Sequence, residues 1–218
     1  MKLSLSQLER ARRHPKAFAA AQLSKFRGIR PTFFGYWVFA AKLYHKLLKA
    51  NDPRALQKAQ DYLLEHCRAK LSSDDDFDEK IALYSKRLGE YIASHATLQQ
   101  PTIQTNKRIE FSGVAGHTIS GVIGRLDIIP GGGFAATNFE LRPTNWQDHL
   151  RTAITQRTLA NDLGRSPSKI QVGMYCLEMR SHDYVSLSDN QIEKSITESA
   201  RVLNTVDAEL KVLKRAKA

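Results

Sequence analysis

The stretch GRLDIIPGGGFAATNFELRPTN, residues 124–145, places two short apolar runs on either side of a Pro-Gly-Gly-Gly turn. Runs of β-branched and aromatic residues bounded by Gly and Pro predict two strands joined by a tight turn. Each run also carries a carboxylate, Asp127 on the first and Glu140 on the second, and Arg142 follows two residues later. Burying a carboxylate is costly unless a cation or hydrogen-bond donors offset the lost hydration. The stretch therefore predicts a hairpin with a polar site, for which a metal ion is one suitable partner.

Helical patterns precede this hairpin, and helices alternate with strands after it. Before it, helices are expected at 5–26 with a break near Pro15, at 32–50, at 52–71 starting from an Asp52 cap, and at 77–95. From residue 107 on we expect strands at 107–113, 117–129 and 133–142, a helix at 145–164, strands at 169–179 and 183–188, and a helix at 190–214. This order fits an α/β (α+β) fold with a mixed sheet and flanking helices. An N-terminal helical region, residues 1–105, would pack on a core of residues 106–218 in a single compact unit.

The composition is that of an ordinary globular protein, since 42% of the 218 residues are apolar and 25% are charged. No apolar run approaches the roughly 20 residues that span a bilayer, and the N-terminus becomes charged too early for a signal peptide. We therefore expect a cytoplasmic protein without membrane contact. Cys67 and Cys176 lack metal-ligand spacing and are expected to be buried thiols, without a zinc or iron–sulfur site.

The net charge of +11 is concentrated at the start of the chain. Residues 1–50 hold eleven Lys or Arg and one acidic residue, Glu9, whereas residues 51–218 hold 22 basic and 21 acidic residues. A one-signed region of this kind suits a polyanion such as nucleic acid, although a solubilising surface is the alternative. The residues that we expect to contact nucleic acid are Arg10, Arg12, Arg13, Lys16, Lys25, Arg27 and Arg30.

The two carboxylates of the hairpin suggest a specific chemistry. On a strand, Glu140 and Arg142 point to one face while Phe139 and Leu141 point to the other. If Asp127 on the neighbouring strand brings its oxygens to the same point, the pair can bind a hard divalent cation such as Mg²⁺. Together with a nearby cation, such a site would suffice for metal-assisted cleavage of a phosphodiester.

Five segments, in this order, resemble motifs of the PD-(D/E)xK nucleases. LSLSQLERARRHPKAF, residues 3–18, is similar to an opening Ser-x-Leu helix followed by a Cys-Pro pair, and AKLYHKLL, residues 41–48, is similar to a Gly-x-x-x-His segment. GRLD at 124–127 resembles the Gly-x-x-Asp motif, and FELR at 139–142 resembles the apolar-Asp/Glu-x-Lys motif. QRTLA at 156–160 resembles a Gln-x-x-x-Tyr helix motif. The set is closest to the RecB-like exonuclease branch, which includes the nuclease module of recombination helicases and the CRISPR-adaptation nucleases.

This resemblance implies a restriction-endonuclease-like sheet and a nuclease that hydrolyses phosphodiester bonds of DNA with Mg²⁺ or Mn²⁺. Asp127, Glu140 and His45 would hold the ion, Arg142 would stabilise charge at the phosphorus, and Gln156 would orient the site or the strand. The implied substrate is single- or double-stranded DNA, or RNA. The implied partner is a helicase or a defence-complex protein, with a role in DNA repair, recombination or phage/CRISPR-type defence. The cysteines that bind an iron–sulfur cluster in part of this branch are missing, so we expect no cluster.

The sequence also departs from these motifs. Arg142 replaces the usual lysine and is a poor proton carrier because it stays protonated. His14 stands in the place of the cysteine, Ala41 in that of the glycine and Ala160 in that of the tyrosine. An alignment shifted to NFE would put Asn138 and Glu140 in the acid and lysine positions and give a degenerate site. These departures favour a second hypothesis, a catalytically inactive nuclease-fold subunit that binds nucleic acid or partner proteins in a larger complex.

Each candidate residue has a structural interpretation as well. His45 would then be a satisfied core histidine, Asp127 a cap for the turn at Pro130, Glu140 and Arg142 a plain ion pair, and Gln156 a helix-surface amide. The aromatic residues Phe33, Phe34, Tyr36 and Trp37 would either pack in the core at helical spacing or stack on unpaired bases.

Overall fold

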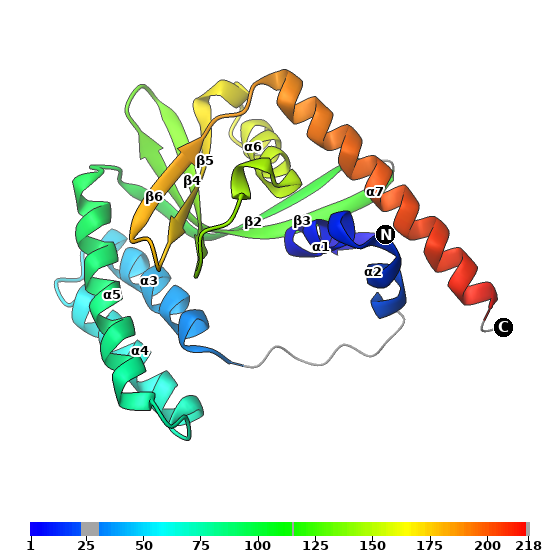
Figure 1. Cartoon of the computed structure of the whole chain (residues 1–218). Helices are drawn as coiled ribbons and strands as arrows, with labels where there is room; N and C mark the ends of the chain where they lie inside the picture. The colour runs from blue at the N-terminus through cyan, green and yellow to red at the C-terminus, as the bar shows by residue number, and fades with distance from the viewer. Residues whose placement is uncertain (23–30, 115, 217–218) are drawn as a thin grey trace.

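A computed structural model describes residues 1–22, 31–114 and 116–216, and within these it contains seven α-helices and six β-strands (Figure 1). The α-helices are α1 (Leu5–Arg13), α2 (Pro15–Gln22), α3 (Phe33–Lys49), α4 (Ala55–Leu71), α5 (Phe77–Thr97), α6 (Leu150–Asp162) and α7 (Asp189–Arg215). The strands are β1 (Lys2–Ser4), β2 (Thr102–Val114), β3 (His117–Ile129), β4 (Gly133–Glu140), β5 (Ile170–Cys176) and β6 (Ser181–Val185). None of these described helices combines the length and the hydropathy needed to cross a membrane.

The sheet is built around the long strand β3. β2 pairs antiparallel with it along almost its full length. On its other edge, β3 pairs first with β1 in parallel, at Thr118–Ser120, and then with β4 in antiparallel, at Arg125–Ile129. The chain crosses over through α6, and β5 then pairs parallel with β4 and antiparallel with β6. The order β1-β3-β4-β5-β6, with β2 on β3, is therefore a mixed sheet.

This arrangement confirms the predicted fold class, an α/β (α+β) fold with a mixed sheet, flanking helices and a helical N-terminal region. Differences from the prediction include two in the strands. β1 was not expected, because three residues of strand leave little periodic signal in a sequence. β2 begins at Thr102, so the boundary predicted after residue 105 falls inside a strand.

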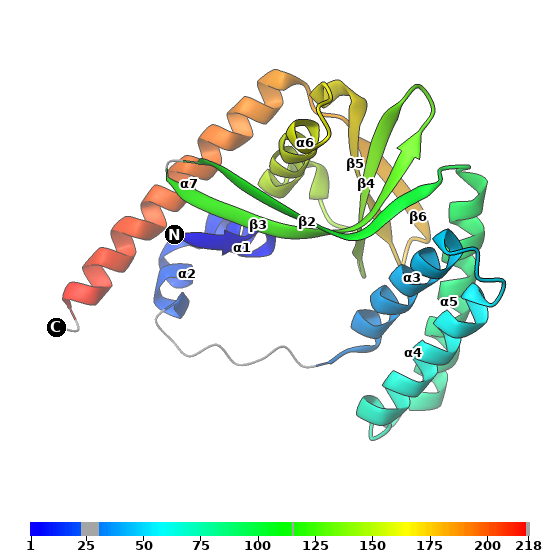
Figure 2. The same cartoon turned by 180° about the vertical axis from the view of Figure 1, so that it is seen from behind.

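Of the three apolar clusters among the described residues, the two large ones lie at opposite ends of the sheet. One packs α1, α2, α6 and α7 against the long β2–β3 hairpin, with Leu8, Ile123 and Leu203 at its centre. The other packs α3, α4 and α5 on β4 and β5, around Trp37 and Tyr91. Figure 2 shows the two helical groups on either side of the arched hairpin. Of the aromatics of α3, Phe33 and Trp37 are core residues, which confirms the packing interpretation for these two.

The hairpin between β3 and β4 depends on glycines at two places. In its turn, Gly131 and Gly132 have φ angles of 81° and 74°, a conformation that L-residues rarely adopt. At Gly124, an added Cβ would lie 2.7 Å from the Phe139 ring and 3.0 Å from the carbonyl oxygen of Thr137. Gly124 therefore permits β3 and β4 to approach closely where the two strands begin to separate.

Local signals at the helix ends are mostly confirmed. Ser4 caps α1 and forms a reciprocal capping box with Gln7. Gly164 follows α6 with a φ of 59°, as expected of a glycine after a helix. The start of α4 was predicted wrongly, because Asp52 bonds the backbone of Arg54 and the side chain of Lys58 instead of capping the helix. Both cysteines are free and buried, as expected.

Candidate functional site: a basic cleft and a separate buried polar cluster

Asp127 and Glu140 lie on opposite faces of the sheet. Asp127 pairs with Ala135 in the β3–β4 ladder, and Glu140 lies five residues further along β4. Five residues of strand span about 16 Å, and an odd separation turns the side chain to the other face. Asp127 therefore faces α3 and α5, where its neighbours are His95 and Thr102, while Glu140 faces Arg151 of α6. The structure does not bring the two predicted metal ligands together.

Asp127 belongs to a buried polar cluster. Its Oδ2 accepts a hydrogen bond from Nε of Arg125 at 2.7 Å, and its Oδ1 accepts one from the Thr102 hydroxyl at 2.7 Å. Arg125 is itself buried and also donates to the hydroxyl of Tyr91. Burial opposes ionisation of Asp127, but the surrounding His95, Arg125 and Thr102 lower the pKa of its carboxyl below the ordinary value. Asp127 is therefore an ionised partner of a buried arginine, neither a turn cap nor an open metal ligand.

Both ring nitrogens of His45 are engaged in this cluster. Nε2 lies 2.7 Å from the Tyr91 hydroxyl, and Nδ1 lies 3.2 Å from the Thr102 hydroxyl. Because Thr102 donates its proton to Asp127, Nδ1 of His45 must donate to Thr102 and Nε2 must accept from Tyr91. Burial, with the nearby charge of Arg125, lowers the pKa of His45 to about 2, so the ring is neutral. The core interpretation of His45 is thus the one that the contacts support.

The predicted metal ligands do not fit a metal ion. His45 and Asp127 use their nitrogens and oxygens within the cluster, and Glu140 is on the other face of the sheet. Within residues 1–22, 31–114 and 116–216, no group of three His, Cys, Asp or Glu side chains could hold an ion. Asp127, Glu140 and His45 therefore do not meet at one point in this structure, and the binding of Mg²⁺ or Mn²⁺ stays a prediction.

Arg142 and Gln156 both make contacts away from the cleft, with a surface glutamate and with buried backbone groups respectively. The Arg142 side chain is 77% exposed and pairs with Glu178 at 3.2 Å, and it does not line the cleft described below. Gln156 is buried, and its amide bonds the backbone N–H and carbonyl of Leu187 as well as the carbonyl of Pro167. It ties α6 to the chain that leads into α7, and it is neither a surface amide nor a residue of the cleft described below.

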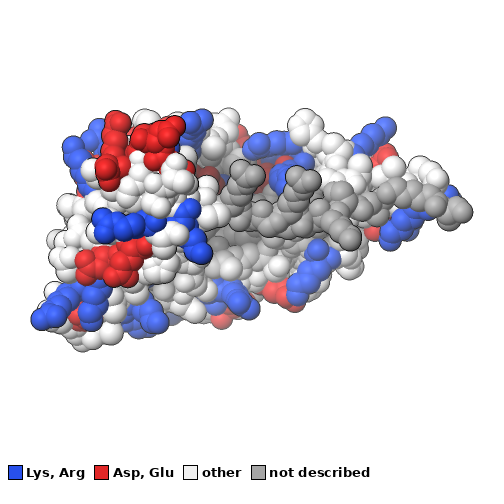
Figure 3. Space-filling view, turned by 90° about the horizontal axis from the view of Figure 1, so that it is seen from below, with Lys and Arg blue, Asp and Glu red and all other residues white. Residues whose placement is uncertain are grey.

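The predicted nucleic-acid contacts of the N-terminal region divide into groups. Arg10 and Arg13 are exposed on α1, whereas Arg12 forms a two-pronged pair with Glu198 of α7. Nζ of Lys16, on α2, lies 3.9 Å from Oε1 of Glu209, which is also on α7. Lys25, Arg27 and Arg30 lie outside the described residues. Figure 3 shows that Lys and Arg are interspersed with Asp and Glu on the face seen from below. Glu198 and Glu209 of α7 compensate Arg12 and Lys16, so part of the expected basic surface is neutralised.

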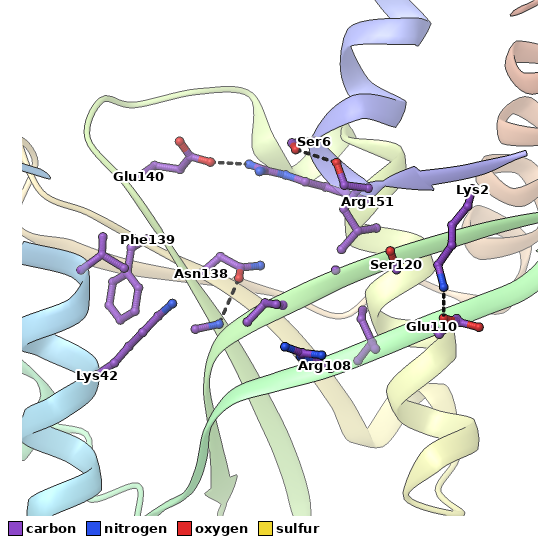
Figure 4. A pocket seen from close by; sticks show the side chains of 17 residues that line it. Lys2, Ser6, Lys42, Arg108, Glu110, Ser120, Asn138, Phe139, Glu140 and Arg151 are labelled. Carbon is purple, nitrogen blue, oxygen red and sulfur yellow. Dashed lines mark hydrogen bonds and ion pairs between the residues drawn. The ribbon is translucent and has the colours of Figure 1, made fainter. Parts of the chain in front are cut away.

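A cleft of about 770 Å³ opens between the two helical groups. Its floor is formed by Arg108–Glu110 of β2 and by Ser120, Gly121, Val122 and Gly124 of β3. β1 and the N-terminus of α1 form one wall, and Val38 and Lys42 of α3 form the other. The end of β4, with Asn138 and Glu140, and Arg151 of α6 close it. Figure 4 shows Lys42 extending from α3 toward the middle of this space.

The cleft carries more positive than negative charge. Lys2 pairs with Glu110 at 2.9 Å, and Arg151 pairs with Glu140 at 2.7 Å, so these four charges compensate each other. Lys42 and Arg108 remain, and within the described part of the chain neither has an ion pair or a hydrogen bond. Burial lowers the pKa of Lys42, so a bound anion would be needed to compensate its charge fully. The cleft therefore has the electrostatic character of an anion-binding site.

Sequence reasoning missed Lys42, Arg108 and Arg151 as site residues. Lys42 stands alone among apolar neighbours on the predicted second helix, and that isolation is a signal that could have singled it out. Arg125 was missed too, although Arg125-x-Asp127 is an opposite-charge pair on one face of a predicted strand. Arg108 and Arg151 carry no comparable signal, because their position depends on how distant elements pack.

Comparisons with known proteins give little further information. No protein-family model and no curated protein matches the sequence. Two solved structures are similar in part. LHK-Exo in complex with dAMP is 14% identical with a TM-score of 0.34, over 82% of this chain and 91% of that one. SSO0001 is 10% identical with a TM-score of 0.33, over 90% of this chain and 84% of that one. Scores this low support no inference about function, and the fold class rests on the order and pairing of the elements.

Proposed function

We propose that the protein binds the phosphate backbone of nucleic acid in the cleft between α1 and α3. The observation that carries this proposal is the pair of cations, Lys42 and Arg108, which line the cleft without an anionic partner in the described structure. Phosphate oxygens accept hydrogen bonds from Lys and Arg in most protein–nucleic acid complexes. The proposed function corresponds to the second hypothesis from the sequence, a nuclease-like fold that binds nucleic acid.

The remaining surface supports the same kind of ligand. Arg10 and Arg13 are exposed on α1, the helix whose first turn lines the cleft. The N-terminus of that helix adds a partial positive charge, which favours phosphate. Ser4, Ser6 and Asn138 supply neutral hydrogen-bonding groups around the two cations. A polyanion that passes through the cleft and along α1 would meet Lys42 and Arg108 first and then Arg10 and Arg13.

The salt dependence of binding tests this proposal. We expect the affinity for a fluorescent 20-nucleotide DNA, followed by fluorescence anisotropy, to fall steeply as the KCl concentration rises. Lys42→Ala and Arg108→Ala should each weaken binding and reduce the slope of log K against log salt by about 1. Lys70→Ala, on the exposed surface of α4, is the matched control and should leave both quantities unchanged. If the control behaves like the two cleft variants, the cleft is not the binding site.

Metal-dependent hydrolysis of DNA is the second candidate, because Glu140 lies in the same cleft as the two cations. This activity would not use the pairing of Asp127 with Glu140 that the resemblance implied. The test is to incubate the protein with end-labelled DNA and RNA in Mg²⁺, Mn²⁺ or EDTA. Metal-dependent products that disappear in Glu140→Gln would favour hydrolysis. Intact substrate under all conditions would exclude hydrolysis and leave nucleic-acid binding as the proposed function. The helicase or defence-complex partner that the resemblance implies stays a prediction, to be tested by co-purification.

A further inference from the structure

We infer that the cleft takes a single strand of nucleic acid, with an unpaired base stacked on Phe39 and the backbone on Lys42 and Arg108. This inference rests on the proposed function and names its substrate class. The observation behind it is that Phe39, on α3, has 55% of its surface exposed, the largest exposed fraction of any aromatic residue in the described chain. In single-strand binding sites, an exposed aromatic ring stacks on a base while a neighbouring cation binds the phosphate of the backbone.

Phe39 lies beside Lys42 on α3, and Lys42 lines the cleft while the Phe39 ring lies outside its lining. They lie three residues apart on α3, and Nζ of Lys42 stands 5.7 Å from the centre of the Phe39 ring. Residues three apart on a helix lie side by side, so the ring and the ammonium group face the same approach. Val38, one residue before Phe39, lines the cleft together with Lys42. A strand held by Lys42 would thus place its next base within reach of the Phe39 face.

A duplex cannot make this contact. In a duplex the faces of the bases are covered by their stacked neighbours, and exposing one requires unpairing that costs a few kcal/mol. The cleft volume of about 770 Å³ is in the range of a small-ligand site, which suits a short stretch of one strand better than a double helix. The floor adds Val122, which is 49% exposed and offers a second apolar contact to a base or sugar.

The experiment compares four fluorescent probes at one salt concentration: dT20, U20, a 20-base-pair DNA duplex and a 20-base-pair RNA duplex. We expect dT20 or U20 to bind at least tenfold more tightly than the corresponding duplex, and the comparison of the two single strands shows whether DNA or RNA is preferred. Phe39→Ala should weaken single-strand binding on the order of tenfold, as loss of one base stack does, and Phe39→Trp should restore it. Leu83→Ala, an exposed apolar residue of α5, is the matched control.

The outcomes separate this inference from the proposed function. If single strands and duplexes bind equally and Phe39→Ala has no effect while Lys42→Ala still weakens binding, the cleft binds nucleic acid but the single-strand inference is wrong. If none of the four probes binds, both the inference and the proposed function are wrong. Circular dichroism of each variant confirms that a loss of affinity does not come from unfolding.

Discussion

Arg125 donates a hydrogen bond from Nε to Oδ2 of Asp127 over 2.7 Å, and neither side chain is accessible to solvent. The two residues are neighbours on one face of β3, and the Arg125 guanidinium reaches on to Tyr91 of α5. An ion pair in this position joins the sheet to the helical group of α3, α4 and α5. A carboxylate that the sequence motif would assign to catalysis is thus part of the internal structure.

The first prediction follows from this ion pair. Asp127→Asn should lower the free energy of unfolding by about 3–5 kcal/mol, because removing one partner leaves Arg125 as a buried charge without compensation. Urea denaturation followed by tryptophan fluorescence measures the change. Asp75→Asn, at an exposed position before α5, should change the free energy of unfolding by less than about 0.5 kcal/mol. A variant that unfolds like the wild type but has lost a nuclease activity would contradict the structural role of Asp127.

The second prediction concerns pH. In the folded chain the pKa of His45 is lowered to about 2, mainly by burial, whereas the unfolded value is near 6.5. Between these values the unfolded chain binds more protons, so stability rises with pH and is complete only above about 6.5. On acidification from pH 7.5 to pH 5, His45 alone should remove on the order of 2 kcal/mol from the free energy of unfolding. Urea denaturation at the two pH values measures this loss.

Other groups around His45 act in the same direction. Burial lowers the pKa of His182 of β6 to about 3, so its protonation in the unfolded chain near pH 6.5 adds to the loss, and Asp127 loses its stabilising charge only at lower pH. The share of His45 is isolated with His45→Gln, which keeps one donor and one acceptor for Thr102 and Tyr91 but does not titrate. The variant should show a smaller loss between pH 7.5 and pH 5 than the wild type. His66→Gln on the surface of α4 is the control, and an equal effect from both variants would refute the assignment.

The third prediction concerns Gln156, which the resemblance placed in the active site. Gln156→Ala should destabilise the fold by about 1–3 kcal/mol, because the N–H of Leu187 and two carbonyl groups lose their buried partner. Thermal unfolding by circular dichroism measures the effect, and Gln57→Ala on the surface of α4 is the control. At a temperature where the variant is folded, its affinity for DNA should equal that of the wild type. Reduced affinity without reduced stability would instead support the role in the site.

The sequence predicted most of the fold because the fold depends on local signals. The Gly turn at 131–132, the capping box at Ser4 and the apolar periodicity of the helices are each readable within a few residues. The strand order was only partly readable, because the pairing of β1 with β3 joins residues more than 110 positions apart. Such pairings are decided by packing, which leaves no period in the sequence.

The site was predicted less well because a strand motif fixes the residue types but not the register. Asp127 and Glu140 are both acidic and both on neighbouring strands, as expected, yet the five-residue offset between Ala135 and Glu140 turns them to opposite faces. The glycine turn of the hairpin determines that offset, but the length of the turn alone does not predict which residues of the two strands pair. Lys42 and Arg108 meet only because α3 and β2 pack against the same space.

The last prediction compares two arginines that follow Glu140 in the chain. Arg142 is the residue that the motif would place at the phosphate, but it is 77% exposed and pairs with Glu178 away from the cleft. Arg151 is only 20% exposed and pairs with Glu140 in the cleft. Arg151→Ala should weaken DNA binding on the order of tenfold, or about 1.4 kcal/mol, because Glu140 is then an uncompensated negative charge near the phosphates. Arg142→Ala should leave the affinity within about twofold of the wild type, since exposed pairs contribute little. The double variant Glu140→Gln with Arg151→Ala should recover part of the affinity, because the repelling charge is gone.

If Arg142→Ala costs more affinity than Arg151→Ala, or if the double variant binds more weakly than Arg151→Ala alone, the ligand contacts this end of β4 in the way the motif implied and not through the cleft.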